Sequence, residues 1–212
     1  MVQRASFTFG PFSENTWLIW DEELNCMVVD PGCYTQDEEQ QLEGFIREKK
    51  LKPCMLVNTH AHIDHVLGNA FVHRVWGLKP HLHPADVELY FGAETYGAVW
   101  GIRVPSLPEP ETELLQQSEL YLGKHRFEIR FTPGHAPGEV CLVQHEQGFV
   151  IAGDVLFNGS IGRTDLPGGD YATLIASIRR ELLSLPDHFE VCCGHGDETT
   201  IGKERASNPF LN

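Results

Sequence analysis

Four side chains that can bind a metal ion fall within residues 60–65: His60, His62, Asp64 and His65. They cannot all face one side of a regular helix or strand, because side-chain direction repeats every 3.6 residues in a helix and every 2 in a strand. They suit a loop wrapped around an ion. Neutral imidazole and carboxylate are common ligands of Zn²⁺, Fe²⁺ and Mn²⁺. The segment therefore predicts a metal centre, to which the fold must bring any further ligands.

Three more candidate ligands stand at the ends of apolar segments that we expect to be strands: His135, Asp154 and His195. Each has a glycine beside it, and glycine lets the backbone come close to a buried ion. A lone histidine is more often a surface or capping residue, but this combination favours ligands held on a rigid scaffold. We interpret the other histidines as ordinary, although 81 and 83 could chelate from one strand face; these are residues 73, 81, 83, 125, 145 and 188.

Strand-like and helix-like segments alternate in both halves of the chain. The predicted strands are 7–9, 16–20, 26–29, 54–59, 127–131, 140–143, 149–152 and 191–193. The first predicted helix begins at a capping box at 35–38 and is ended by Pro53. Three more helices are predicted at about 66–75, 84–96 and 171–185. Residues 101–113 are expected to be a loop and 203–212 a tail. The pattern indicates two packed sheets with helices outside, in a single domain over 1–212.

Composition excludes several classes of protein. The 212 residues include 16 Lys and Arg against 30 Asp and Glu, a formal charge of −14, which repels nucleic acid and anionic lipid. There is no apolar run long enough to span a membrane, and the first residues lack a secretory stretch. The six cysteines show no C-x-x-C spacing, and we expect free, mostly buried thiols. We therefore expect a cytoplasmic protein without nucleic-acid or membrane partners.

These motifs resemble those of the metallo-β-lactamase-fold hydrolase superfamily, and within it the glyoxalase II-like (hydroxyacylglutathione hydrolase-like) branch. The segments that carry the resemblance are 59–65, 132–138, 152–157, 162–165 and 194–196. They span most of the chain in the family's order. The resemblance implies an α/β (α+β) chain folded as a four-layer αββα sandwich.

The resemblance also implies two metal sites. The first ion would be bound by His60, His62 and His135, the second by Asp64, His65 and His195, and Asp154 would bridge them. Asp64 and Asp154 would also take catalytic roles. An aspartate at 154 argues against a common zinc β-lactamase, in which cysteine stands at that place. The cofactors would be two divalent ions per chain, zinc first, with iron or manganese as alternatives.

A centre of this kind suits hydrolysis of a small anionic thioester. Two divalent ions, two aspartates and a hydroxide leave a charge of about +1 inside an acidic protein, which can attract an anion. Metal binding lowers the pKa of water from ~15.7 towards ~7. A thiolate leaving group has a pKa near ~8.5 and needs little proton donation. The substrate we expect is S-lactoylglutathione.

The residues that would bind substrate are less well marked. Arg163, in segment 162–165, fits either a loop salt bridge or an anchor for a substrate carboxylate. In glyoxalase II a C-terminal helical domain supplies basic residues for glutathione, whereas only 17 residues follow His195 here. We expect a compact form without that domain, in which Lys203 and Arg205 partly substitute. The sequence indicates nothing about the oligomeric state.

One alternative uses the same motifs for different chemistry. Persulfide dioxygenases resemble this branch and hold a single iron by two histidines and an aspartate, here His60, His135 and Asp154. Iron content and oxygen uptake separate this alternative from the hydrolase.

Overall fold

Two β-sheets lie face to face in the computed structural model, which describes residues 1–113, 115 and 117–211. The first sheet has the order β1 (Gln3–Phe9), β2 (Glu14–Trp20), β3 (Asn25–Val29), β4 (Lys52–Val57) and β5 (Pro80–His81). The second has the order β13 (Thr199–Thr200), β12 (Glu190–Cys193), β9 (Phe149–Gly153), β8 (Val140–Gln144), β7 (His125–Phe131) and β6 (Glu119–Leu122). A short hairpin, β10 (Leu156–Phe157) and β11 (Ser160–Ile161), stands apart from both sheets.

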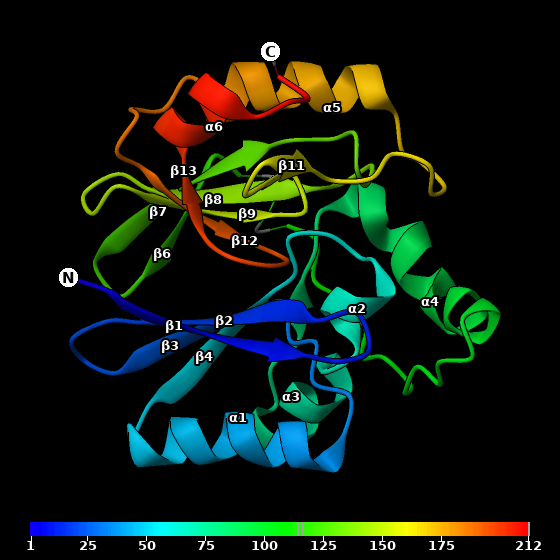
Figure 1. Ribbon diagram of the computed structural model, residues 1–212. Helices are drawn as coiled ribbons and strands as arrows, with labels where there is room; N and C mark the ends of the chain where they lie inside the picture. Colours follow the sequence, from blue (N-terminus) through cyan, green and yellow to red (C-terminus); the bar gives the residue numbers. More distant parts are fainter. Residues whose placement is uncertain (114, 116, 212) are drawn as a thin grey trace.

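Helices cover the outer face of each sheet, which gives the four layers of an αββα sandwich (Figure 1). The first sheet is covered by α1 (Gln36–Glu48) and α3 (Asn69–Trp76), and the second by α5 (Tyr171–Ser177) and α6 (Ile201–Ser207). The short α2 (Ile63–Val66), the 3-10 turn η1 (Pro84–Asp86) and α4 (Val87–Val99) lie at one end of the sandwich. The π-helical turn η3 (Ile178–Leu182) continues α5. Among the described residues, no helix is long and apolar enough to cross a membrane.

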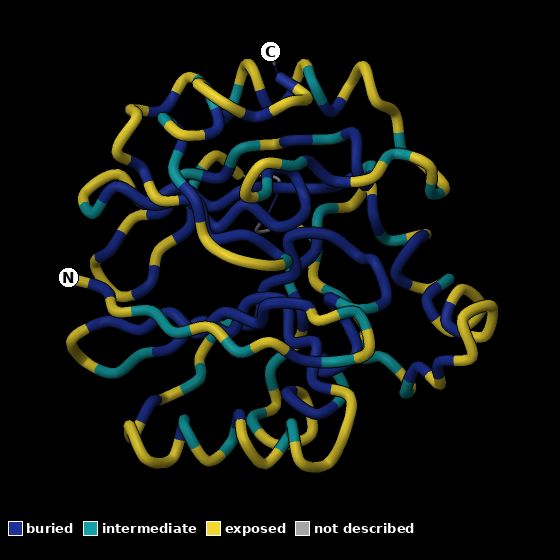
Figure 2. Tube along the Cα trace, viewed as in Figure 1, coloured by how far each residue is buried: buried dark blue, intermediate teal, exposed yellow. Residues whose placement is uncertain are grey.

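Three apolar clusters hold these layers together. Between the sheets, Trp17 and Met27 of the first pack with Phe127 and Phe149 of the second. Outside the first sheet its residues pack with α1 and α3, and outside the second its residues pack with α5 and η3. The strands β2, β8 and β9 are therefore buried at every residue, and dark blue segments run through the middle of Figure 2. The six cysteines are free thiols, and all except Cys54 are buried.

Helix α1 begins as the capping box predicts. The Thr35 side chain accepts a hydrogen bond from the backbone N–H of Glu38. In return, the Glu38 carboxylate accepts one from the backbone N–H of Thr35. The expected end at Pro53 is wrong. The helix ends at Glu48 because the chain reverses at Lys50, which has a φ of 57°, and Pro53 lies inside β4.

The directions of the strands bring five of their ends to one edge of the sandwich. β3 and β4 are parallel neighbours in the first sheet, and β9 and β12 are parallel neighbours in the second. β7 runs in the same direction as β9 because the antiparallel β8 separates them. Residues that directly follow these strands therefore meet where the two sheets come together.

The C-terminal residues are not a tail, as the sequence led us to expect. Ile201–Ser207 forms α6, whose Thr200 N-cap accepts a hydrogen bond from the N–H of Lys203. Its buried Glu204 carboxylate accepts bonds from the Thr199 hydroxyl, the Asn208 amide and the N–H of Gly159. Gly159 lies in the turn of the β10–β11 hairpin, so α6 holds that hairpin in place. Asn212 lies outside the described residues.

We predict that Glu204→Ala lowers the free energy of unfolding by about 2–4 kcal/mol, because it leaves buried donors without an acceptor. Ser207→Ala is the matched control. Ser207 is exposed on the same helix, where its hydroxyl bonds to the backbone oxygen of Lys203, and its loss should cost at most about 0.5 kcal/mol. Urea denaturation of the two variants measures both values. Equal, small losses would show that the Glu204 bonds do not hold the hairpin.

Candidate metal centre

The motif at 60–65 is divided between a loop and a helical turn. β4 ends at Val57, and the chain bends at residues 59–60 before it reaches His62, which is the N-cap of α2. His60 and His62 therefore lie on the loop, whereas Asp64 and His65 lie on the helical turn. The single loop that we expected thus includes only the first half of the motif.

One set of donor atoms joins His60, His62 and His135. His62 Nδ1 lies 2.7 Å from His135 Nε2, which lies 3.3 Å from His60 Nε2. Their three donor nitrogens all lie within 4.8 Å of one another. The arrangement brings two residues of the motif to the loop after β7, some 70 positions later in the chain.

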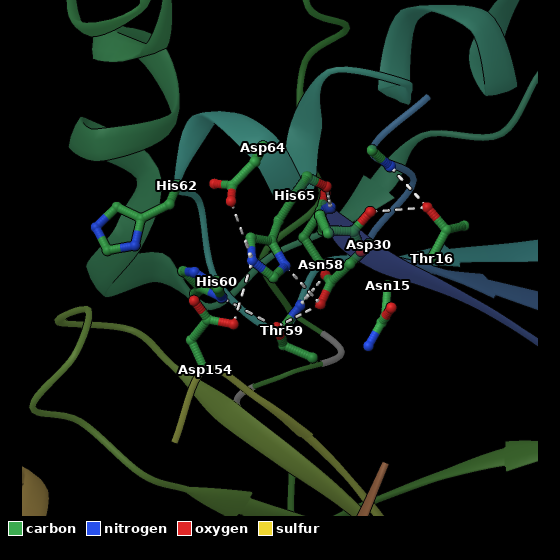
Figure 3. Close-up of polar contacts among 12 residues, drawn as sticks. Asn15, Thr16, Asp30, Asn58, Thr59, His60, His62, Asp64, His65 and Asp154 are labelled. Atoms are coloured by element: carbon green, nitrogen blue, oxygen red, sulfur yellow. Dashed lines mark hydrogen bonds and ion pairs between the residues drawn. The ribbon is translucent and has the colours of Figure 1, made fainter. Parts of the chain in front are cut away.

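A second set joins Asp64, His65 and His195. Asp64 Oδ2 lies 3.2 Å from His195 Nε2 and 3.9 Å from His65 Nε2. These three residues also form a group whose donor atoms lie within 4.8 Å of one another. Figure 3 shows His65 between the carboxylates of Asp64, Asp154 and Asp30.

Asp154 lies between the two sets. Its Oδ1 is 3.4 Å from His65 Nε2, and its Oδ2 is 3.4 Å from both His135 Nε2 and His195 Nε2. The seven candidate ligands of the sequence analysis therefore come together in the structure, with this carboxylate in contact with both groups.

The protonation states differ between the two sets. Burial lowers the pKa of His60 and His135 and brings that of His62 to about 3, so these rings are neutral at pH 7. Burial also opposes the charge of His65 and His195. The carboxylates of Asp154 and Asp64 more than offset this, raising the pKa of His65 and bringing that of His195 to about 9. Burial acts against both aspartates, but His65 and His195 hold their pKa values below the usual range.

Three of the candidate imidazole ligands have a polar contact at the ring nitrogen that does not face the other ligands. His135 Nδ1 lies 2.7 Å from the backbone oxygen of Arg163, and His195 Nδ1 lies 3.2 Å from that of Ser13. His60 Nδ1 lies 3.1 Å from Thr59 Oγ1. Bonds of this kind orient metal-binding imidazoles and fix their tautomer.

Asp30 supports the centre from the end of β3. Its carboxylate accepts bonds from the N–H and hydroxyl of Thr59 and lies 3.1 Å from His65 Nδ1. Because that nitrogen is not the one that faces Asp154, we interpret Asp30 as a partner that orients the ring. Asp30 is buried with a φ of 48°, a backbone strain of the sort found at functional sites.

At two positions near the centre, neighbouring side chains come so close to the backbone that only glycine fits. A Cβ at Gly194 would lie 2.2 Å from Asp154 Oδ1. Gly153 has a φ of 49°, and a Cβ there would lie 2.5 Å from Thr59 Oγ1. The glycines next to His195 and Asp154 therefore allow close packing around the centre, while the approach of the backbone to an ion stays a prediction.

The donor set fits divalent metal ions. His62 Nε2, His65 Nε2 and Asp154 Oδ1 are buried without a hydrogen-bond partner. Buried polar atoms rarely stay unsatisfied. Neutral imidazoles and ionised carboxylates that converge in this way can be satisfied by cations, which supports divalent metal binding at this place.

Sequence reasoning missed several buried acids around the centre. No signal in the sequence separates Asp30, Glu14, Asp86 and Glu139 from surface acids. Asp86 accepts hydrogen bonds from the N–H of Ala61, between two motif histidines, and from that of Gly138. Glu139 accepts one from the N–H of Asp154. Only their burial in the folded chain reveals them.

The three basic residues proposed for substrate lie in different places. Arg163 is exposed beside the centre, but its guanidinium makes two 2.7 Å bonds to Asp165 and lowers that carboxyl's pKa to about 2. Lys203 bonds to Asn158. Arg205 bonds to the backbone oxygens of Leu183 and Leu185, because α6 packs against the end of η3. The structure thus does not bring Lys203 or Arg205 to the centre.

The centre forms the floor of a cleft of about 400 Å³. His62, Asp64, His135, Asp154 and His195 line it, and Arg163 stands at its side. Its remaining lining is largely apolar and comes from the β1–β2 turn, α4 and the β10–β11 hairpin. Among the described residues, His81 and His83 do not line this cleft.

The sequence model of the metallo-β-lactamase superfamily matches residues 9–195. The chain belongs to this superfamily. The match includes all seven candidate ligands, and the αββα sandwich is the metallo-β-lactamase fold that the sequence led us to expect.

Several proteins of the superfamily are similar to this chain over nearly its whole length. The hydroxyacylglutathione hydrolase GloC of Haemophilus influenzae is 41% identical over 207 residues, which cover 95% of this chain and 94% of that one. The structure of TTHA1623 in a di-iron-bound form has a TM-score of 0.88 and 39% identity, covering 98% of this chain and all of that one. The BLEG-1 B3 metallo-β-lactamase also has a TM-score of 0.88, with 31% identity over 99% and 100% of the two chains. This chain is thus similar in extent to compact metallo-β-lactamase-fold proteins.

We predict that Asp86→Asn lowers metal affinity by about tenfold, because an amide nitrogen cannot accept the bond from one of the two N–H groups that fix the ligand loops. Glu88→Gln, at an exposed position two residues away on α4, is the control and should leave the affinity unchanged. Competition with a chromophoric chelator measures both variants. Unchanged affinity in Asp86→Asn would show that the loops are fixed without this carboxylate.

The two sets of ligands should respond differently to pH. Below pH 9 the His195 ring carries a proton that a metal ion must displace when it binds. The metal affinity of the set Asp64, His65 and His195 should therefore rise by about tenfold for each unit of increasing pH and each displaced proton. The set of His60, His62 and His135 is already neutral, and its affinity should change little above pH 7. Chelator competition from pH 7 to 9 on His62→Gln and His195→Gln, each of which keeps one set intact, measures the two slopes. Equal slopes would contradict the assigned protonation states.

Proposed function

We propose that this protein is a metal-dependent thioester hydrolase with two divalent ions per chain. The observation that carries the proposal is the arrangement of Asp154 between two sets of donor atoms on the floor of a cleft. His60, His62 and His135 would hold one ion, Asp64, His65 and His195 the other, and Asp154 would contact both. When bound, the two ions would supply activated water at neutral pH and polarise the substrate carbonyl.

The chain's own residues would orient the reactants. Asp64 and Asp154 both line the cleft and stay ionised, so each can accept a hydrogen bond from the water that attacks the carbonyl. This role gives them the catalytic part that the sequence analysis assigned. The buried partners behind the histidines keep the rings from turning as protons move.

The leaving group explains the preference for a thioester. A thiol has a pKa near ~8.5, so a thiolate can depart at neutral pH without a strong proton donor. An amide or a simple ester would need more help from an acid. The ionised carboxylates on the floor of the cleft are suited to accepting protons rather than donating them.

S-lactoylglutathione is the substrate we propose to test first. The similarity to a protein named hydroxyacylglutathione hydrolase supports this choice. Arg163 lies beside the cleft, where it could attract the anionic end of the substrate, although its guanidinium also forms an ion pair with Asp165. We propose zinc as the metal, with iron as the alternative that the di-iron form of a similar protein supports.

Metal content and turnover test the proposal together. We predict close to two ions per chain in protein prepared with excess metal, hydrolysis of S-lactoylglutathione, and loss of activity on chelation. Asp154→Ala should lose at least one ion and at least about a hundredfold in kcat/KM, because it removes the carboxylate that both sets contact. His81→Ala is the control and should keep both metal and activity. Full occupancy and turnover in Asp154→Ala would refute the arrangement.

The same preparation tests the iron dioxygenase alternative. Two contacts join the residues of this alternative: His135 Nε2 lies 3.3 Å from His60 Nε2 and 3.4 Å from Asp154 Oδ2. One tightly bound iron per chain, together with oxygen uptake on a persulfide and no thioester hydrolysis, would replace the hydrolase by this activity.

A further inference from the structure

Apolar side chains from separate parts of the fold line the cleft above the metal centre. Six residues make up what we call the apolar wall: Phe12, Leu89, Tyr96, Trp100, Phe157 and Ile161. They come from three segments that do not carry metal ligands: the β1–β2 turn, α4 with its C-cap, and the β10–β11 hairpin.

The apolar wall makes aromatic contacts at two places in the cleft. The rings of Phe12 and Trp100 meet edge to face, with centroids 6.0 Å apart. The ring of Phe157 meets that of His195 at the same centroid distance and an interplanar angle of 88°. An apolar group packed on Phe157 would therefore lie next to a candidate metal ligand.

Two of the aromatic side chains are exposed to an extent that packing does not explain. Trp100 is 55% exposed and Tyr96 37% exposed. Both belong to α4 or its C-cap, which lies at one end of the sandwich (Figure 1). Exposed aromatic side chains that gather in a cleft mark a binding site rather than a part of the core.

The cleft offers little to a polar, charged ligand outside the metal centre. Among the described residues that line it, Arg163 is the only lysine or arginine, and its guanidinium is already hydrogen-bonded to the Asp165 carboxylate. Glutathione carries two carboxylates, an ammonium group and two peptide bonds. Most of those groups would find no charged partner on the apolar wall.

We propose that the apolar wall binds the acyl group of the substrate, and that the enzyme prefers thioesters with an extended apolar acyl chain over those with a short polar one. The proposal rests on the thioester hydrolase function given above. Both the acyl chain and the sulfur are bonded to the reacting carbonyl carbon, so position alone does not choose between them. The wall is assigned to the acyl group because an acyl chain can be apolar, whereas the charged groups of the thiol part are better left at the solvent-exposed side of the cleft. Burial of acyl methylenes against aromatic rings supplies the preference.

A series of acyl-glutathione thioesters that differ only in chain length tests the preference. We expect kcat/KM to rise about threefold to fourfold for each added methylene from acetyl through butyryl to hexanoyl, and to exceed the value for S-lactoylglutathione. Trp100→Ala and Phe12→Ala should flatten this dependence, so that their loss in kcat/KM grows with the length of the acyl chain. Phe91→Ala is the matched control, because Phe91 is an exposed aromatic residue on α4 that does not line the cleft.

A binding measurement separates the apolar wall from catalysis. Non-hydrolysable S-methyl, S-butyl and S-hexyl glutathione thioethers keep the same polar part, and calorimetry on the metal-loaded protein gives their affinities. We expect affinity to increase with alkyl length, accompanied by a negative heat-capacity change, and this increase to be lost in Trp100→Ala but kept in Phe91→Ala.

The possible results distinguish the two proposals. If no thioester is hydrolysed, the proposed function fails, and the thioether affinities alone decide whether the wall selects apolar groups. If S-lactoylglutathione is hydrolysed but kcat/KM and affinity stay flat or fall with chain length, the function stands and the acyl preference is overturned. An increase that persists unchanged in Trp100→Ala and Phe12→Ala also overturns it.

Discussion

The carboxylate of Asp154 is the point on which the rest of the site depends. It is buried, ionised and 3.4 Å from imidazole nitrogens on three different segments of the chain. A buried negative charge is unfavourable unless positive charge or hydrogen bonds surround it. His65 and His195 supply that charge in the metal-free chain, and divalent ions would supply it when bound. The glycines beside it and the N–H that Asp154 donates to Glu139 keep the carboxylate at this place.

The positions of the ligands could be predicted because they follow from strand direction. Apolar runs that stop at a histidine or aspartate mark the ends of buried strands, and the structure gathers the ends of β4, β7, β9 and β12 at one edge. The capping box at Thr35 was equally informative, since both partners of the box are close in sequence. The layers and the candidate ligands were therefore within reach of the sequence.

What the sequence did not reveal depends on contacts between distant segments. Nothing local shows that Glu204 binds the turn of a hairpin 45 positions earlier, or that Asp86 fixes Ala61 and Gly138. Arg205 was expected near substrate from its charge alone, whereas the packing of α6 directs it to backbone oxygens at the end of η3. The apolar wall likewise combines segments that show no common pattern until the chain is folded.

The division of the chain between the two sheets has a consequence for the order of assembly. The first sheet is built from residues 3–81 and the second from 119–200, so during synthesis the first can form before the second has left the ribosome. The centre lies at the seam between them. A nascent chain that has completed the motif at 60–65 still lacks His135, Asp154 and His195, and its ligands stay incomplete until both sheets have packed. The complete set of ligands therefore forms, and can hold metal tightly, only after both sheets have been synthesised and have packed together.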